Sequence, residues 1–284
     1  MAQFTNQATI QYNGTTVNSN IVTGEITQVL TVWKDSTVSD FNAGDILTYV
    51  VSIQNSGATA ITDLTVTDNL GAYTFGAGTV TPLSYTGDPV LYYVNGILQT
   101  TPTVTAGPPM VITGISVPAG LNATLVYRTR VNGYAPLETG STIDNTVTVS
   151  GGGLSSAVTA SETVTVNADP NLTITKAVNP TVIVENGQLT YTFTIQNTGA
   201  TEADAAAGII VSDTFNPVLS NISVELNSAP WAQAGNYTYN TTTGEFATVA
   251  GRITVPAATY TQDAVTGLWS VTPGVTTLTV TGTV

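Results

Sequence analysis

The sequence predicts an all-β protein made of two tandem antiparallel β-sandwich domains. Thr, Val, Asn, Gly and Ala dominate its 284 residues, and alternating Thr and Val is typical of strands. The expected strands are short and are separated by Gly, Pro and Asn-Gly turns, for example at Asn95-Gly96. A set of motifs occurs twice in the chain, which indicates two copies of one domain.

The repeat keeps a nearly constant spacing. The shift is 142 positions both from Lys34 to Lys176 and from Tyr49 to Tyr191, and it grows to 145 from Asp68 to Asp213 after a small insertion. A constant shift over several motifs is the signature of a repeated structural unit rather than of chance similarity. The matched segments are residues 30–34 with 172–176, 46–49 with 188–191, 53–57 with 195–199, 64–68 with 209–213, and 124–131 with 277–284.

The two copies differ in how they close. The first continues into an alternating strand at residues 143–149, a turn at Gly151-Gly152-Gly153 and a second strand at 157–166. The second copy reaches Val284 without these strands, whereas residues 4–12, a turn at Asn13-Gly14 and residues 17–29 resemble them. We therefore expect four parts: an N-terminal donor strand or hairpin (1–29), a complete sandwich (30–166), a linker (167–171) and an incomplete acceptor sandwich (172–284).

The first strand is the organising feature of this prediction. Its alternation places one set of side chains on a single face, and this face is expected to enter the incomplete sandwich of a neighbouring subunit. The residues of that donor strand are Phe4, Asn6, Ala8, Ile10 and Tyr12.

These motifs resemble a known family. Lys on the first strand, Gly-Asp-x-Leu-Thr-Tyr, Gln-Asn-x-Gly, Val-Thr-Asp and a closing Asn-Thr-Val-Thr-Val are similar to the repeat called domain of unknown function eleven, found in bacterial and archaeal surface proteins. The resemblance implies an immunoglobulin-like sandwich and a cell-surface or appendage role. The layout also resembles clostridial spore-appendage subunits.

Each copy is expected to place a Lys, an Asp and an Asn on inward faces of three strands. Lys34 shares its face with Leu30 and Val32, Asp68 lies with Leu64 and Val66, and Asn145 lies with Val147 and Val149. The same alternation puts Lys176, Asp213 and, on the donor strand, Asn6 on inward faces. The chain has only these two lysines, and a buried ammonium is costly unless it is paired.

This set resembles isopeptide-forming pilin and adhesin domains, in which a Lys attacks the side-chain amide of an Asn. Burial favours a neutral amine nucleophile and a neutral assisting acid. The expected bonds are Lys34–Asn145 within a chain and Lys176–Asn6 between chains. The expected assisting acids are Asp68 and Asp213, with Glu162 and Glu25 as second choices. The alternative is a buried Lys–Asp salt bridge with the Asn hydrogen-bonded nearby.

Composition restricts the possible functions. The net charge of −13 disfavours nucleic acid and anionic membranes as partners. The absence of His and Cys removes the commonest catalytic base, metal ligand and thiol chemistry. We expect no cofactor, no metal site and no enzyme activity beyond autocatalytic isopeptide formation. No apolar run is long enough to span a membrane, and the N-terminus does not resemble a signal peptide.

The leading hypothesis is a structural subunit of an extracellular, cell-surface or spore-surface fibre. It would polymerise with itself, head to tail, by strand donation. The alternative is a monomeric adhesin or ligand-binding module whose N-terminal hairpin folds back onto its own second domain. The sequence identifies neither the anchoring partner nor the surface that such a fibre would contact.

Overall fold

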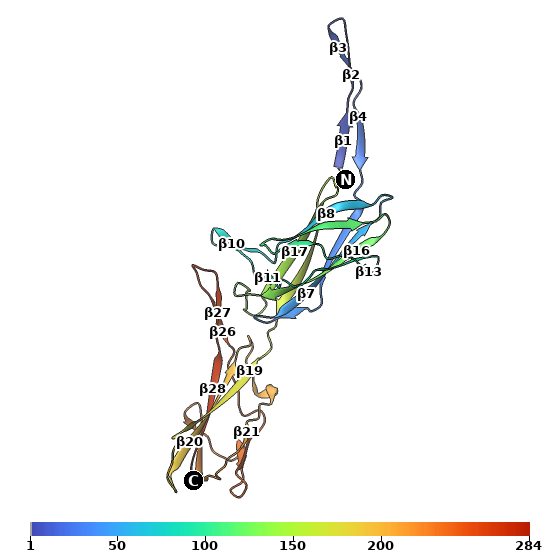
Figure 1. The fold of residues 1–284 in the computed structure, drawn as a ribbon. Helices are drawn as coiled ribbons and strands as arrows, with labels where there is room; N and C mark the ends of the chain where they lie inside the picture. Colours follow the sequence, from blue (N-terminus) through green and yellow to red (C-terminus); the bar gives the residue numbers. More distant parts are fainter. Residues whose placement is uncertain (1) are drawn as a thin grey trace. The chain divides into compact units, whose positions relative to one another are not determined.

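The computed structural model describes residues 2–284, and most of its paired strands are antiparallel (Figure 1). The chain forms two compact units. The first contains the residues up to Ala135 together with Thr142–Thr165, and the second contains Pro136–Ser141 and Val166–Val284. Within residues 2–284 the single helical element is the 3₁₀ turn η1 (Ala205–Ala207), and no helix there is long and apolar enough to cross a membrane. The predicted all-β class, with two sandwich domains and an N-terminal hairpin, is confirmed.

The N-terminal hairpin consists of four short strands. β1 (Ala2–Asn6) pairs with β4 (Val22–Ile26), and β2 (Thr9–Tyr12) pairs with β3 (Thr15–Asn18). Asn13 and Gly14 form the turn with positive φ angles of 45° and 76°, the combination that a tight hairpin turn requires. The strand expected over residues 4–12 is thus interrupted between Asn6 and Thr9, because the returning segment has one extra residue between the two paired regions.

The first sandwich packs two sheets against each other. One sheet has the order β13-β12-β16-β7-β5, with β11 also pairing with β16; the other has the order β14-β15-β8-β17-β18-β6. A small separate ladder joins β9 (Tyr73–Phe75) and β10 (Gly78–Val80). The remaining strands are β5 (Leu30–Ser36), β6 (Asp40–Phe41), β7 (Ile46–Asn55), β8 (Ile61–Asp68), β11 (Leu83–Tyr85), β12 (Leu91–Val94), β13 (Ile97–Leu98), β14 (Thr103–Thr105), β15 (Met110–Val117), β16 (Asn122–Val131), β17 (Thr142–Gly151) and β18 (Val158–Val166).

Alternation along these strands builds the core of the first sandwich. On β5 the side chains of Leu30, Val32 and Lys34 are buried while those between them are exposed, as the sequence predicts. β7 and β17 bury alternate residues in the same way. Because the second sheet covers this face, two layers of apolar side chains are removed from water.

The second unit contains a counterpart of the first sheet of the first unit, but a counterpart of only half of that unit's second sheet. Its larger sheet has the order β19-β20-β28-β22-β23, its smaller sheet has the order β21-β25-β24, and β26 pairs with β27 in a separate hairpin. The strands are β19 (Leu172–Asn179), β20 (Gln188–Asn197), β21 (Ser212–Thr214), β22 (Ser220–Leu226), β23 (Ala229–Pro230), β24 (Tyr237–Tyr239), β25 (Glu245–Thr248), β26 (Thr259–Gln262), β27 (Trp269–Thr272) and β28 (Gly274–Thr283).

The register confirms that these sheets correspond. Lys34 lies opposite Val51 on β7, and Lys176 lies opposite Phe193 on β20, so the 142-residue shift holds on both strands. The strands β21, β25 and β24 occupy the places of β8, β15 and β14. Within the described part of the second unit, no strand takes the places of β17 and β18, and β21 pairs on one side only.

Candidate functional site

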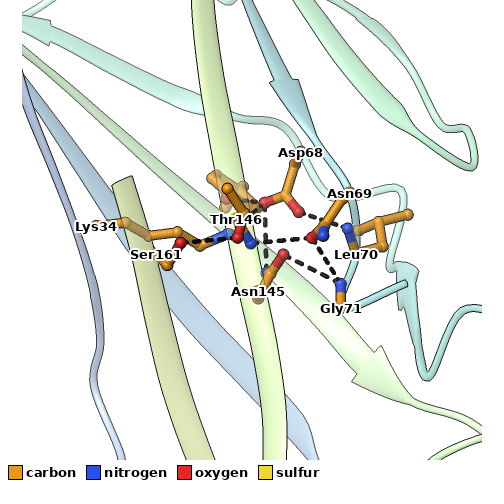
Figure 2. Close-up of polar contacts among 9 residues, drawn as sticks. Lys34, Asp68, Asn69, Leu70, Gly71, Asn145, Thr146 and Ser161 are labelled. Carbon is orange, nitrogen blue, oxygen red and sulfur yellow. Dashed lines mark hydrogen bonds and ion pairs between the residues drawn. The ribbon is translucent and has the colours of Figure 1, made fainter. Parts of the chain in front are cut away.

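The first unit brings Lys34, Asp68 and Asn145 together between its two sheets (Figure 2). Lys34 comes from the edge strand β5 of one sheet, whereas Asp68 ends β8 and Asn145 lies on the neighbouring β17 in the other sheet. Each residue sits on the inward face of its strand, and the exposed fractions are 3%, 0% and 0%. The strand alternation read from the sequence is therefore sufficient to place all three side chains in the core.

Asp68 contacts both prospective partners through one oxygen. Its Oδ2 lies 2.8 Å from Lys34 Nζ and 3.4 Å from Asn145 Nδ2. Its other oxygen, Oδ1, accepts the backbone N–H of Leu70 at 2.7 Å, which fixes the carboxylate plane. A carboxylate between an amine and an amide nitrogen is well placed to move a proton from the first to the second.

Burial changes the acidity of Lys34. Removal from water lowers the pKa of Lys34 from 10.5 to about 8, although the attraction of Asp68 opposes this shift. Two tyrosine rings lie beside the ammonium, with centroids 4.6 Å (Tyr49) and 5.9 Å (Tyr127) from Nζ. The amine is thus much closer to its neutral, nucleophilic form at neutral pH than an exposed lysine would be.

Tyr127 helps to hold the acid. Its hydroxyl donates a hydrogen bond to Asp68 Oδ2, the oxygen that also contacts Lys34. Burial raises the pKa of Tyr127 well above its usual value, so the hydroxyl stays protonated and remains a donor. Asp68 therefore has three donors around it in addition to the Asn145 amide, and its position is fixed on every side.

The turn after β8 supplies a donor to the amide of Asn145. The backbone N–H of Gly71 lies 3.2 Å from Asn145 Oδ1 and 3.0 Å from Asn69 Oδ1 (Figure 2). Gly71 has a φ of +71°, and a Cβ there would lie 2.5 Å from Ile143 Cγ2. A side chain at this position would therefore push the turn away from β17, so glycine allows the N–H to reach the amide oxygen.

Glu162, the second choice as the assisting acid, lies directly opposite Asn145 in the β17–β18 ladder and is partly buried. It is close enough to raise the pKa of Lys34, but its effect comes after that of Asp68. Since Asp68 makes direct contacts with both Lys34 and Asn145, the geometry favours Asp68 in this role.

The second unit contains the matching Lys176 and Asp213 in a far more open setting. Their side chains form an ion pair, but they are 40% and 19% exposed, compared with 0% for both partners in the first unit. Lys176 Nζ also lies over the ring of Tyr191, 4.3 Å from its centroid, as Lys34 lies over Tyr49. The second unit therefore brings together two of the three residues expected at this site, Lys176 and Asp213.

A hollow lies beside this ion pair. It measures about 370 Å³ and runs between β19 and β21, where the apolar side chains of β19 are uncovered. Ile174 is 54% exposed, whereas its counterpart Val32 in the first unit is 7% exposed. The hollow is lined by Ile174, Thr175, Lys176, Phe193, Ile210, Val211, Ser212 and Asp213.

The expected donor residues lie on the N-terminal hairpin. Asn6 ends β1 opposite Val22 and is exposed, as are Phe4 (51%), Ile10 (63%) and Tyr12 (60%); Ala8 follows Asn6 in the short break before β2. In this register Glu25 lies opposite Gln3, three positions from Asn6 and on the other face of the ladder. Within the hairpin as described, Glu25 does not face Asn6, whereas Asp213 forms an ion pair with Lys176 in the second unit.

Three residues of the site were not assigned a role from the sequence. Tyr49 ends a repeated motif and Tyr127 lies within another, but a tyrosine in a strand is more often ordinary core. Gly71 follows the Val-Thr-Asp motif in a turn where glycine is common. The recurrence of Tyr49 as Tyr191 at the same shift as the two lysines was the one signal available.

Comparisons with known proteins give only distant similarities. No protein-family model matches this chain, so the resemblance to the repeat called domain of unknown function eleven is not supported by a family match. No curated protein matches it either. The fold assignment therefore rests on strand pairing and burial.

Similar solved structures include several pilins. The chain is similar to the pilus backbone protein RrgB of Streptococcus pneumoniae (13% identity, TM-score 0.35, 86% of this chain and 55% of that one). It is also similar to the major pilin subunit BcpA of Bacillus cereus in its D312A form (11%, TM-score 0.38, 80% and 59%) and to the major pilin SpaD of Corynebacterium diphtheriae (14%, TM-score 0.35, 58% and 42%). The chain thus spans little more than half of the first two proteins, and TM-scores of this size do not establish a shared fold.

Proposed function

We propose that this protein is the structural subunit of an extracellular or spore-surface fibre that grows head to tail by strand donation. The observation that carries the proposal is the contrast between matched faces: β5 is buried, whereas β19 exposes the same apolar positions beside the one-sided strand β21. An uncovered apolar groove next to a free strand edge is the usual template for an added strand. The N-terminal hairpin, with its exposed apolar side chains, is the proposed occupant.

The pairing of β17 with β8 in the first unit indicates the register in which the donor strand would pair with β21. There β17 pairs with β8 so that Val147 lies opposite Asp68 and Val149 lies opposite Val66. If Asn6 takes the place of Asn145, then Ala8 takes the place of Val147 and lies opposite Asp213. The apolar side chain of Ile10 would then enter the core beside Val211, and Asn6 would reach the Lys176–Asp213 pair.

The bonds that we propose are amides formed by the same reaction at both sites. Lys34 Nζ bonds to Asn145 Cγ within a chain, the Cγ–Nδ2 bond breaks, and ammonia leaves; Lys176 and Asn6 do the same between chains. Docking supplies proximity and orientation, which can replace a large part of the barrier. It also expels water from Lys176, so the reaction starts only after the donor strand is in place.

A second candidate is a monomeric surface adhesin or ligand-binding module whose hairpin folds back into its own second unit. The exposed face of β19 favours strand insertion but does not distinguish a strand of the same chain from one of a neighbour. This candidate predicts the same covered groove without any fibre.

Electron microscopy and hot-detergent electrophoresis of the purified chain distinguish these proposals. We expect fibres that give a ladder of oligomers after boiling in detergent, and no fibres after deletion of residues 1–12. Asn6→Ala and Lys176→Ala should each still give fibres, but fibres that dissolve to monomers, whereas the hairpin control Asn20→Ala should behave as the parent.

Three results would each count against one part of this proposal: the fibre, the donor segment or the bond between subunits. Isolated particles from the parent chain would favour the adhesin. Normal fibres from the shortened chain would mean that the hairpin is not the donor. Detergent-resistant oligomers from both Asn6→Ala and Lys176→Ala would exclude the Lys176–Asn6 bond.

A further inference from the structure

The outer face of the first sheet in the first unit carries an exposed tryptophan. Trp33 lies on β5 between the buried residues Val32 and Lys34, so its side chain points away from the core, and it is 47% exposed. An indole ring left in water forgoes the stabilisation that its burial would give. The matched position in the second unit, 142 residues later, is Thr175 on β19. Strand formation and pairing therefore do not require an aromatic side chain here.

Strand pairing places Trp33 at the end of a row of outward side chains. The row crosses the sheet and consists of Trp33 (β5), Ser52 (β7), Thr124 (β16) and Tyr93 (β12), each opposite the next in register. Ser52, Thr124 and Tyr93 are partly exposed. Since neighbouring strands lie about 4.8 Å apart, the two aromatic residues stand about 14 Å apart. The row thus has an aromatic ring at each end and hydroxyl groups between them.

A row of uncharged amides runs beside the first row. Asn122 of β16 lies opposite Gln54 of β7, and the backbone N–H of Asn95 donates to the carbonyl oxygen of Asn122 at 3.0 Å. The side chains of Gln54, Asn95 and Asn122 are exposed. Within residues 2–284, neither these amide groups nor the hydroxyl of Ser52 form a hydrogen bond with another residue. Because a primary amide both donates and accepts, these groups are free to bind a polar ligand from either side.

These side chains line an open hollow on the sheet. It measures about 290 Å³ and is lined by Trp33, Ser52, Ile53, Gln54, Asn95, Gly120, Leu121 and Asn122. None of these residues is charged. In the adjoining row on the other side of Trp33, Asp35 lies opposite Val50 and is the only charged residue of that row among the paired strands. The hollow thus offers an aromatic surface and neutral polar groups, with no charge that would attract an ion.

The chemistry of this lining fits a neutral saccharide. The C–H face of a sugar ring packs on an indole, while its hydroxyl groups donate to and accept from amides and hydroxyls. An anionic polymer is disfavoured, because the chain has a net charge of −13 and the two rows contain no Lys or Arg. An apolar peptide would leave the amides unpaired, which costs free energy. The length of the row suits several linked sugar rings rather than one.

We propose that the outer face of this sheet, from Trp33 to Tyr93, binds a neutral polysaccharide chain. Trp33 packs on one sugar ring, Tyr93 contacts a ring further along, and the three amides of the neighbouring row bind hydroxyl groups along one side of the chain. The site lies on the face opposite to that of Lys34, so it depends neither on the covalent bond nor on fibre growth. In a fibre of the proposed kind, identical sites would repeat along its length, and weak sites would act together.

The second unit keeps the strands of this face but not the groups that would recognise a sugar. Both units retain a glutamine and a hydroxyl group on the second strand of the sheet, whereas the aromatic ring and one amide are absent from the second unit. The corresponding residues are Trp33 and Thr175, Asn122 and Val275, Gln54 and Gln196, and Ser52 and Thr194. Saccharide binding is therefore expected in the first unit and not at the matched face of the second.

Binding of neutral oligosaccharides to the full chain tests this proposal. The chain is immobilised on a sensor surface, and cellohexaose, laminarihexaose, mannohexaose and chitohexaose in its N-acetylated form are passed over it in turn. Because each subunit carries its own site, the measurement is the same for monomers and for fibres. We expect saturable binding of at least one of these neutral sugars and no comparable binding of hexagalacturonate, an anionic control.

Variants identify the face that binds. Trp33→Ala should weaken binding about tenfold, because it removes the stacking surface, and Trp33→Tyr should restore part of the loss. Gln54→Ala should weaken binding about fivefold through the loss of a hydrogen bond. Ile97→Ala is the matched control, because it removes a side chain that is 68% exposed on the other face of the same sheet, and it should bind as the parent does.

Several results would overturn the inference while leaving the fibre proposal untouched. Absence of saturable binding for every neutral sugar is one, and tighter binding of hexagalacturonate is another. A merely structural role of Trp33 predicts a less stable Trp33→Ala variant whose affinity equals that of the parent, and this result also overturns it. If Trp33→Ala does not fold, Gln54→Ala decides, because the exposed Gln54 side chain bonds to no other residue in the described chain. Unchanged affinity in that variant overturns the proposal.

Discussion

Strands β5 and β19 have nearly the same sequence pattern and the same register but opposite environments. Leu30 on β5 is 4% exposed and its counterpart Leu172 on β19 is 37% exposed; Lys34 and Lys176 differ in the same direction. Both strands pair with the equivalent neighbour, β7 or β20. The difference therefore does not lie in the strand or its sheet, but in what covers its inward face.

The covering in the first unit comes from the half-sheet that contains β17 and β18. These strands extend the second sheet past β8, whereas the described part of the second unit ends that sheet at β21. The comparison teaches that alternation defines an inward face but does not bury it. Burial needs a second layer, and among the described residues of the second unit that layer stops at β21 and leaves β19 uncovered.

The largest expected difference between the two units is the loss of stability when Asp68 or Asp213 is replaced by alanine. Asp68→Ala leaves Lys34 buried and unpaired, which should destabilise the first unit by about 3–5 kcal/mol. Asp213→Ala leaves Lys176 free to reach water, so the second unit should change by about 0–1 kcal/mol, as for other exposed ion pairs. Hydrogen exchange measured separately for each unit, with the exposed Asp35→Ala as control, tests this comparison. Equal losses in the two units would contradict it.

A smaller difference is expected for the matched leucines. Leu30→Ala should cost about 3 kcal/mol, because it removes buried methyl groups and leaves a cavity. Leu172→Ala should have little effect on the monomer, because its side chain is already partly in water. In fibres, however, Leu172→Ala should weaken the joint between subunits. Thermal unfolding of monomers and of uncross-linked fibres measures these two stabilities. A large loss of stability in the Leu172→Ala monomer would show that the groove beside β19 is already closed.

The smallest expected effect is the pH dependence of the rate at which the Lys34–Asn145 bond forms in the first unit. The reactive form of the pair holds one proton in total, either on Lys34 or on Asp68. The rate should therefore be flat below the lowered Lys34 pKa of about 8 and should fall about tenfold per pH unit above it, as that proton is lost. Timed mass spectrometry across this range tests the sign. A rate that instead rises through pH 8 would mean that solvent, not Asp68, accepts the proton.

Stability should follow pH with a defined sign in an unlinked variant such as Asn145→Ala. Because the folded pKa of Lys34 (about 8) lies below its usual 10.5, the unfolded chain binds more protons between these values. Stability should rise from pH 8 to pH 10.5 and stay level below pH 8, and urea unfolding at fixed pH values tests this.

The sequence by itself determined the elements and the faces of this protein. Short alternating segments and Asn-Gly turns predicted the strands. The constant shift between Lys34 and Lys176 predicted two equivalent sheets, and alternation alone placed Lys34, Asp68 and Asn145 in the core. These features are local or periodic, so they follow from residue order without knowledge of what packs against them.

Only the tertiary structure decided what surrounds those residues. The hydrogen bond from Tyr127 to Asp68 and the approach of Gly71 to Asn145 join segments far apart in sequence. The break in the hairpin and its register, which turns Glu25 away from Asn6, likewise depend on one extra residue in the partner strand. Contacts of this kind arise where two sheets meet, and an alternating pattern on one strand carries no information about the side chains opposite it.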